Sequence, residues 1–238
     1  MPLSVGVLII GSLLWDSEQN RPAWRKARLD MTTVKTVTAP IRYGRRSGRN
    51  RGNTYTMVFS RSAEVGQGKV VQCTRSVFAA ADLVSEAQAL WKAELPTASV
   101  GRIAADWGCV AVLCNPERKI PEEVLRGWAM RVADEPQYGN VPQAAEEGSL
   151  VSETGLLQIA WPRLVEGEAA VQLDLLLVTA NHPTLNGTPL CYSPVETIAR
   201  AWNEAGNHVE YFWRNSDCGI RTFQDDEIRA LLHPREQA

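Results

Sequence analysis

Val5-Gly-Val-Leu-Ile-Ile-Gly-Ser-Leu-Leu-Trp-Asp16 is an apolar run that ends in a Gly-Ser-Leu turn. The six apolar residues at 5–10 are too few for a useful helix but match one buried strand. We therefore expect a central strand there. Gly11 and Ser12 at its carboxyl end let the backbone approach a ligand closely and offer N–H groups and a hydroxyl. The turn favours a cradle for an anion or carbonyl, with a plain exit turn as the alternative.

Composition points to an ordinary soluble globular protein. The chain has 238 residues, 45% of them hydrophobic, and a formal net charge of −2. Neither the overall composition nor the net charge indicates nucleic acid as a partner. No Lys or Arg precedes the first apolar run and Asp16 follows it closely, which does not fit a secretory signal. No segment approaches the roughly 18 apolar residues of a membrane span. We expect a cytoplasmic protein with no membrane partner.

The cysteines and histidines do not predict a metal site. Five cysteines and three histidines are scattered, and no Cys-x-x-Cys pair occurs. An odd number of cysteines in apolar runs is typical of small buried side chains in a reducing compartment. We therefore expect no metal ligands in this chain.

Hydrophobic periodicity predicts mixed α and β structure. In the first half we expect strands at 31–42, 54–60, 69–74 and 107–114, and one main helix at 79–95. In the second half we expect helices at 121–133 and 194–205, strands at 171–179 and 209–213, and a terminal helix. Thr222 and Asp225 resemble a capping box at the start of that last helix.

Five arginines gather in ten residues and alternate with glycines. They are Arg42, Arg45, Arg46, Arg49 and Arg51. Arginine binds carboxylates and phosphates through paired N–H groups, so the segment could fold over a small anion. A nucleic-acid patch and a solvated hairpin loop are the two other interpretations.

The main helix carries a pair of carboxylates, Glu86 and Glu94, eight residues apart and near the same face. Leu90 and Trp91 add apolar bulk near the second carboxylate, and a partly desolvated glutamate suits general acid or base chemistry. The alternative is that one or both lie at the solvent border.

The aromatic and polar run at 211–226 could form a pocket wall, or simply a strand, a glycine turn and a capped helix. A nucleophile pair of Cys218 with His182 or His208 has no supporting local signature.

The order of these features resembles the gamma-glutamyl cyclotransferase-like superfamily over residues 4–114. The features are the turn Gly11-Ser-Leu, the arginine-rich segment, the strand Gly66-Gln-Gly-Lys-Val-Val, and the helix that carries Trp91-Lys-Ala-Glu94. In that family the first-strand turn reads Tyr-Gly-Ser-Leu, and the helix after the glycine-rich strand ends in the catalytic glutamate. Here Ile10 stands at the position of the tyrosine.

The resemblance implies an α+β fold, with a small mixed β-barrel in residues 1–115 and an α/β extension in residues 116–238. It implies an enzyme that converts a gamma-glutamyl amine or peptide to 5-oxoproline and a free amine. Glu94 would be the catalytic acid and base. Gly11, Ser12 and Leu13 would bind the substrate, with Arg46 as a further candidate. No cofactor or metal is implied.

Two features of the chain depart from the family pattern. Ile10 in place of tyrosine favours, as the alternative function, a binding or interaction protein of the same fold without the chemistry. Residues 116–238 have no counterpart in compact family members, so they could cover the pocket, form a homodimer contact or redirect specificity.

Overall fold

The computed structural model describes residues 2–17, 20–48, 52–138, 148–167, 170–183 and 192–234. The strands are β1 (Val5–Ile9), β2 (Leu29–Arg46), β3 (Tyr55–Phe59), β4 (Val65–Cys73), β5 (Ala104–Ala105), β6 (Gly108–Cys114) and β7 (Leu175–Asn181). The α-helices are α1 (Arg21–Arg28), α2 (Ala80–Glu94), α3 (Glu122–Ala133), α4 (Val195–Asn203), α5 (Glu210–Asp217) and α6 (Asp225–Leu231), and Gly206–Val209 form the 3₁₀-helix η2. None of the helices within these ranges is long and apolar enough to cross a membrane.

One seven-stranded mixed sheet runs through the molecule in the order β3-β2-β4-β1-β7-β6-β5. The central strand predicted at the start of the chain is confirmed, since β1 lies in the middle of this order and all five of its residues are buried. It pairs antiparallel with β4 and parallel with β7. The carboxyl ends of β1 and β7 therefore lie at the same edge of the sheet.

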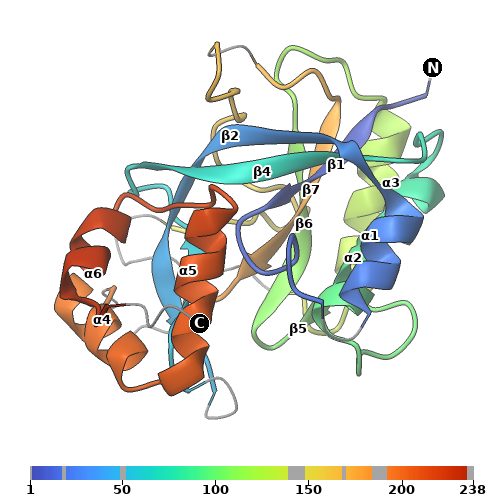
Figure 1. Cartoon of the computed structure of the whole chain (residues 1–238). Coiled ribbons are helices and arrows are strands. Elements are labelled where there is room, and N and C mark those ends of the chain that lie inside the picture. Colours follow the sequence, from blue (N-terminus) through green and yellow to red (C-terminus); the bar gives the residue numbers. More distant parts are fainter. Residues whose placement is uncertain are drawn as a thin grey trace.

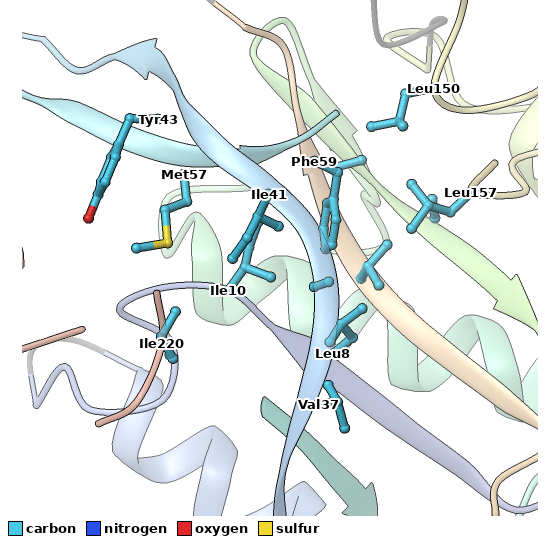
Figure 2. Packing of buried hydrophobic residues seen from close by; sticks show 14 of the residues in the cluster. Leu8, Ile10, Val37, Ile41, Tyr43, Met57, Phe59, Leu150, Leu157 and Ile220 are labelled. Atoms are coloured by element: carbon cyan, nitrogen blue, oxygen red, sulfur yellow. The ribbon is translucent and has the colours of Figure 1, made fainter. Parts of the chain in front are cut away.

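Successive side chains of β1 point to opposite faces of the sheet, because the side chains of a strand alternate with a period of two. They therefore enter two separate hydrophobic cores, one on each face. Val7 and Ile9 pack with α1, α2 and α3 on one face. Leu8 and Ile10 pack on the other face with β2 and β3 residues such as Ile41 and with α4, α5 and α6. Figure 1 shows the two groups of helices on opposite sides of the sheet, and Figure 2 shows part of the second core.

The α+β class is confirmed, but the sheet does not close into the expected barrel. Closure would require its two edge strands, β3 and β5, to pair, and no such ladder occurs in the described ranges. The long strand β2 pairs with β4 along its first part and with β3 along its second part, so the sheet bends at β2 and remains open. Because β7 lies between β1 and β6, residues 1–115 and residues 116–238 build one sheet.

Most other predicted elements are confirmed with shifted ends, whereas the strand predicted at 209–213 is wrong. These residues form the end of η2 and the first turns of α5. Phe212, Asn215 and Ser216 are the buried residues of α5, a spacing of three and four that one helical face requires. Before α6, the Thr222 N–H donates to Asp225 Oδ1 at 2.8 Å, as one of the two bonds of a capping box would. The N-cap residue of the helix is Gln224 and not Thr222, so the complete capping box does not form.

Candidate functional site

A pocket of about 290 Å³ lies at the carboxyl ends of β1 and β7. It brings together residues from segments far apart in the chain. The lining residues include Gly11, Ser12, Leu13, Arg21, Arg45, Thr56, Glu94, Trp107, Thr179, Asn181 and Tyr211. Its position fits the general tendency of ligands to bind beyond the carboxyl ends of parallel strands.

The Gly-Ser-Leu turn forms one wall of this pocket. The chain curls tightly after β1, because the Ser12 carbonyl accepts hydrogen bonds from the Trp15 and Asp16 N–H groups at 3.2 and 2.8 Å. Within the described ranges, the N–H groups of Gly11, Ser12 and Leu13 donate to no protein acceptor. Three donors at one pocket wall are therefore available to a carbonyl or an anion.

Arg21, the first residue of α1, joins the turn to the end of α2. Its side chain is only 5% exposed. One terminal nitrogen donates to Ser12 Oγ at 2.7 Å and to Asp16 Oδ2 at 2.5 Å. The other donates to Glu94 Oε2 at 3.1 Å. A single buried cation thus holds both walls of the pocket in place.

Glu94, the last residue of α2, lies in the same pocket as the turn. Its side chain is 16% exposed, and among the described residues only Arg21 contacts its carboxylate, through Oε2. The second oxygen, Oε1, is thus left for a bound molecule. Glu86, the other carboxylate of the pair, is ion-paired with Arg28 at 2.7 Å and does not line the pocket. The helix therefore separates the two carboxylates rather than joining them in one site.

Arg45, and not Arg46, lines the pocket. The pairing of β2 with β3 changes register between Tyr43 and Arg45, so that Arg45 lies opposite Thr56, another pocket residue. One extra residue in a strand reverses which side chains face a given side beyond it. Arg46 instead donates to the carbonyl of Asn53 at 3.3 Å.

Ring contacts orient the arginines of this segment. The Arg45 guanidinium lies 4.9 Å from the centre of the Trp107 ring, which itself stacks on Trp91 at 4.8 Å. Arg42 lies 3.9 Å from the centre of the Tyr192 ring. Arg49 and Arg51 are outside the described residues. The described part of the segment thus presents Arg45 to a pocket rather than to an open surface.

The end of β7 supplies a polar wall that sequence reasoning missed. Thr179 is 7% exposed, and neither its Oγ1 nor the Oδ1 of Asn181 has a hydrogen-bond partner among the described residues. Buried polar groups in folded proteins nearly always have partners. Thr179 and Asn181 had no local motif to mark them. The signal that could have found them is their position at the end of a strand parallel to β1.

The aromatic run contributes Tyr211 to the pocket. A Cβ placed on Gly11 would lie 2.7 Å from the Tyr211 hydroxyl, so a larger residue at position 11 would require the Tyr211 side chain to shift. Trp15 donates to Asn215 Oδ1 at 2.8 Å, which ties α5 to the turn. Cys218, His182 and His208 do not line the pocket, so the structure does not bring the weakly supported nucleophile pair into it.

Within the described ranges, no group of three or more His, Cys, Asp or Glu side chains is arranged to hold a metal ion. Comparisons with protein-family models, curated proteins and solved structures find no match to this chain.

Proposed function

We propose that this pocket is the active site of an enzyme that converts a gamma-glutamyl amine or peptide to 5-oxoproline and a free amine. The observation that carries the proposal is the placement of Glu94 in one pocket with Gly11, Ser12 and Leu13. Glu94 is the expected base, and Gly11, Ser12 and Leu13 are the expected cradle for the carbonyl. The two segments lie about 80 residues apart in the chain.

Glu94 serves as the acid and base in this scheme. Its Oε1 takes a proton from the substrate's α-amine, whose nitrogen attacks the gamma-carbonyl carbon and forms the ring C–N bond. The bond from that carbon to the leaving nitrogen then breaks, and Glu94 returns the proton to the departing amine. Because the nucleophile belongs to the substrate, the reaction needs no cofactor.

The Gly-Ser-Leu turn stabilises the charge that develops during the attack. Its N–H groups donate to the carbonyl oxygen as that oxygen becomes negative, and such donors act best when they are fixed beforehand. Arg21 fixes them by holding Ser12, and Arg25 assists by donating to the Leu13 carbonyl at 2.7 Å. The pocket also holds the substrate in its folded conformer, which supplies much of the acceleration of an intramolecular reaction.

The test is 5-oxoproline release from a panel of gamma-glutamyl amines and peptides by wild-type protein and by Glu94→Gln. We expect the variant to lose at least about a hundredfold in turnover, since it cannot accept the proton. Glu86→Gln is the matched control, because it changes a buried carboxylate of the same helix outside the pocket. Equal turnover by wild type and Glu94→Gln would overturn the role of Glu94.

A specific observation favours a second function, the binding of a small molecule without turnover. Arg21 already donates to Glu94 Oε2, so this carboxylate is engaged in an ion pair before any substrate binds. If the protein only binds its ligand, compounds of the gamma-glutamyl panel should raise the melting temperature of the protein, and no 5-oxoproline should be released. A homodimer contact by residues 116–238 stays a prediction for either function.

A further inference from the structure

We propose that the Tyr211 hydroxyl is a further catalytic group of this pocket. It donates a hydrogen bond to the carbonyl oxygen that the Gly-Ser-Leu turn binds, and it comes from α5, in the second half of the chain. The inference deepens the proposed function, because it rests on that function for the identity of the reacting carbonyl. It also gives residues 116–238 a direct part in the active site.

The Tyr211 hydroxyl lies against the turn. Tyr211 and Gly11 both line the pocket, and a Cβ placed on Gly11 would lie 2.7 Å from the hydroxyl oxygen. The ring carbon that bears this oxygen would be 3.7 Å away, so the side chain approaches the turn with its polar end. A phenol hydroxyl can donate as well as accept. It therefore adds a donor beside the N–H groups of the turn, where the proposed reaction develops negative charge.

Two ring contacts fix the Tyr211 side chain before a ligand binds. Its ring stacks on the Trp202 ring, with centroids 5.7 Å apart and planes inclined by 8°, and it meets the Trp15 ring edge-on at 6.0 Å. Trp202 is fully buried, so the stacking surface is itself held by the core. A donor that is fixed in advance does not have to reorganise as the charge develops, and it is therefore more effective than a mobile one.

Trp15 and Asn215 fix α5 relative to the turn. Trp15 Nε1 donates to Asn215 Oδ1 at 2.8 Å, and Asn215, about one helical turn after Tyr211, is fully buried. The Arg214 guanidinium lies 4.7 Å from the centre of the Trp15 ring, a second contact between the same two segments. Trp15 follows Leu13 closely in the chain. The segment that carries the N–H groups of the turn therefore also holds the helix that carries the hydroxyl.

The hydroxyl acts as a hydrogen-bond donor and keeps its proton. As the substrate nitrogen attacks, the carbonyl oxygen gains negative charge, and the bond that Tyr211 donates to this oxygen becomes stronger. When the bond to the leaving nitrogen breaks, the carbonyl re-forms and the charge disappears. Glu94 remains the acid and base, so the step requires no oxidant and no further proton acceptor. An interaction that strengthens in the transition state raises kcat more than it lowers KM.

The first test compares turnover by Tyr211→Phe and Tyr43→Phe. Tyr211→Phe keeps the ring in its stack and removes only the hydroxyl. Tyr43→Phe is the matched control, because the Tyr43 ring packs against the same Trp202 ring at 6.3 Å but does not line the pocket. The Tyr43 hydroxyl has no hydrogen-bond partner among the described residues. We expect Tyr211→Phe to lower kcat for 5-oxoproline release about a hundredfold at a nearly unchanged KM, and Tyr43→Phe to keep the wild-type kcat.

The second test measures binding of 5-oxoproline by calorimetry, independently of turnover. The ring carbonyl of 5-oxoproline is the former gamma-carbonyl, so it occupies the place of the reacting group. Tyr211→Phe should lower the affinity about fivefold, the value of one neutral hydrogen bond, and Tyr43→Phe should leave it unchanged. Urea unfolding of both variants shows that each is folded under the conditions of the assay.

Trp15→Phe tests whether the turn positions Tyr211. This change removes the hydrogen bond to Asn215 and should lower kcat, because α5 is then held less firmly against the turn. In the double variant with Tyr211→Phe the two effects should be less than additive, since the position of the ring matters little once its hydroxyl is gone. Strictly additive effects would show that Trp15 influences turnover by another route and would remove the positioning role.

Equal kcat and equal affinity for Tyr211→Phe and wild type would overturn the role of Tyr211, and so would equal losses in Tyr211→Phe and Tyr43→Phe. These outcomes differ from a failure of the proposed reaction. Wild-type turnover that Tyr211→Phe retains removes the hydroxyl from the mechanism and leaves the reaction. Weaker binding by Tyr211→Phe without turnover by wild type removes the reaction and leaves the contact with the ligand. Neither turnover nor binding of 5-oxoproline by wild type would overturn both.

Discussion

Arg21 at the start of α1 donates to the Glu94 carboxylate at the end of α2 across 3.1 Å, with both side chains largely buried. The same guanidinium binds Ser12, so the ion pair fixes the proposed base relative to the Gly-Ser-Leu turn. A cation also suits the end of a helix, where unpaired carbonyls carry partial negative charge. Arg21 is thus the residue on which the geometry of the pocket depends.

Arg21→Met should lower the free energy of unfolding by about 3 kcal/mol, because it leaves Asp16 and Glu94 without their buried cation. Urea unfolding measures the loss. Arg28→Met is the control, since it breaks the other α1–α2 ion pair, with Glu86, outside the pocket. Both variants should lose stability, and only Arg21→Met should also weaken 5-oxoproline binding. An unchanged urea midpoint for Arg21→Met would contradict this interpretation.

Gly11→Ala should be destabilising because its new Cβ would lie 2.7 Å from the Tyr211 hydroxyl oxygen. The next Tyr211 atom lies at 3.7 Å, an ordinary contact, so Tyr211→Phe removes the clash. In a double-mutant cycle monitored by thermal unfolding, the second change should restore about 1 kcal/mol or more of the loss. Strictly additive effects would show that another neighbour excludes the methyl group.

Stability should depend on pH through Asp225. Burial raises the pKa of this carboxyl, although its hydrogen bonds from Thr222 and the charges of Arg229 and Arg221 oppose the shift. The folded state therefore binds the proton at a higher pH than the unfolded state. This contribution to stability is fully present below the unfolded pKa and is lost as pH rises through the folded pKa.

Asp225→Asn removes the titrating carboxyl group. The difference in stability between wild type and this variant therefore isolates the contribution of Asp225. The stability of wild type relative to the variant should increase as the pH falls from 7 toward the ordinary range of a carboxyl group. Denaturant unfolding at a series of pH values measures the difference. A difference that shrinks on acidification would mean that the hydrogen bonds outweigh the burial.

Two cysteines should be unreactive in the folded protein. Burial raises the pKa of Cys73 and of Cys109 to about 12, so very little thiolate is present near neutral pH. Mass spectrometry after iodoacetamide treatment at pH 8 should find both unmodified in the native protein and both modified in denaturant. Rapid native labelling of either one would contradict its burial.

Local patterns predicted the parts of the site that are continuous in the chain. The apolar run before Gly11 predicted the central strand, and the apolar spacing around Leu90 predicted the helix that ends at Glu94. The aromatic run at 211–213 predicts a strand but forms part of α5, because consecutive aromatic residues fit a strand and a helix equally well. Only the burial of Asn215 and Ser216 on the same face as Phe212 distinguishes the two.

The choice between Arg45 and Arg46 was beyond sequence reasoning. A strict period of two places Arg42 and Arg46 on one face of β2. The change of register at Gly44 reverses the alternation and places Arg45 opposite Thr56 at the pocket. Gly44 permits a bulge there but does not require one, since the register depends on how β2 meets β3.

The sequence by itself determined the central strand, the Gly-Ser-Leu turn and the helix that carries Glu94, because each depends on residues that are neighbours along the chain. Only the tertiary structure decided that the sheet stays open, that Arg21 holds Glu94, and that Thr179 and Asn181 complete the pocket. The physical reason is strand pairing: β7 lies parallel to β1 although about 170 residues separate them, and local periodicity carries no information about such a contact.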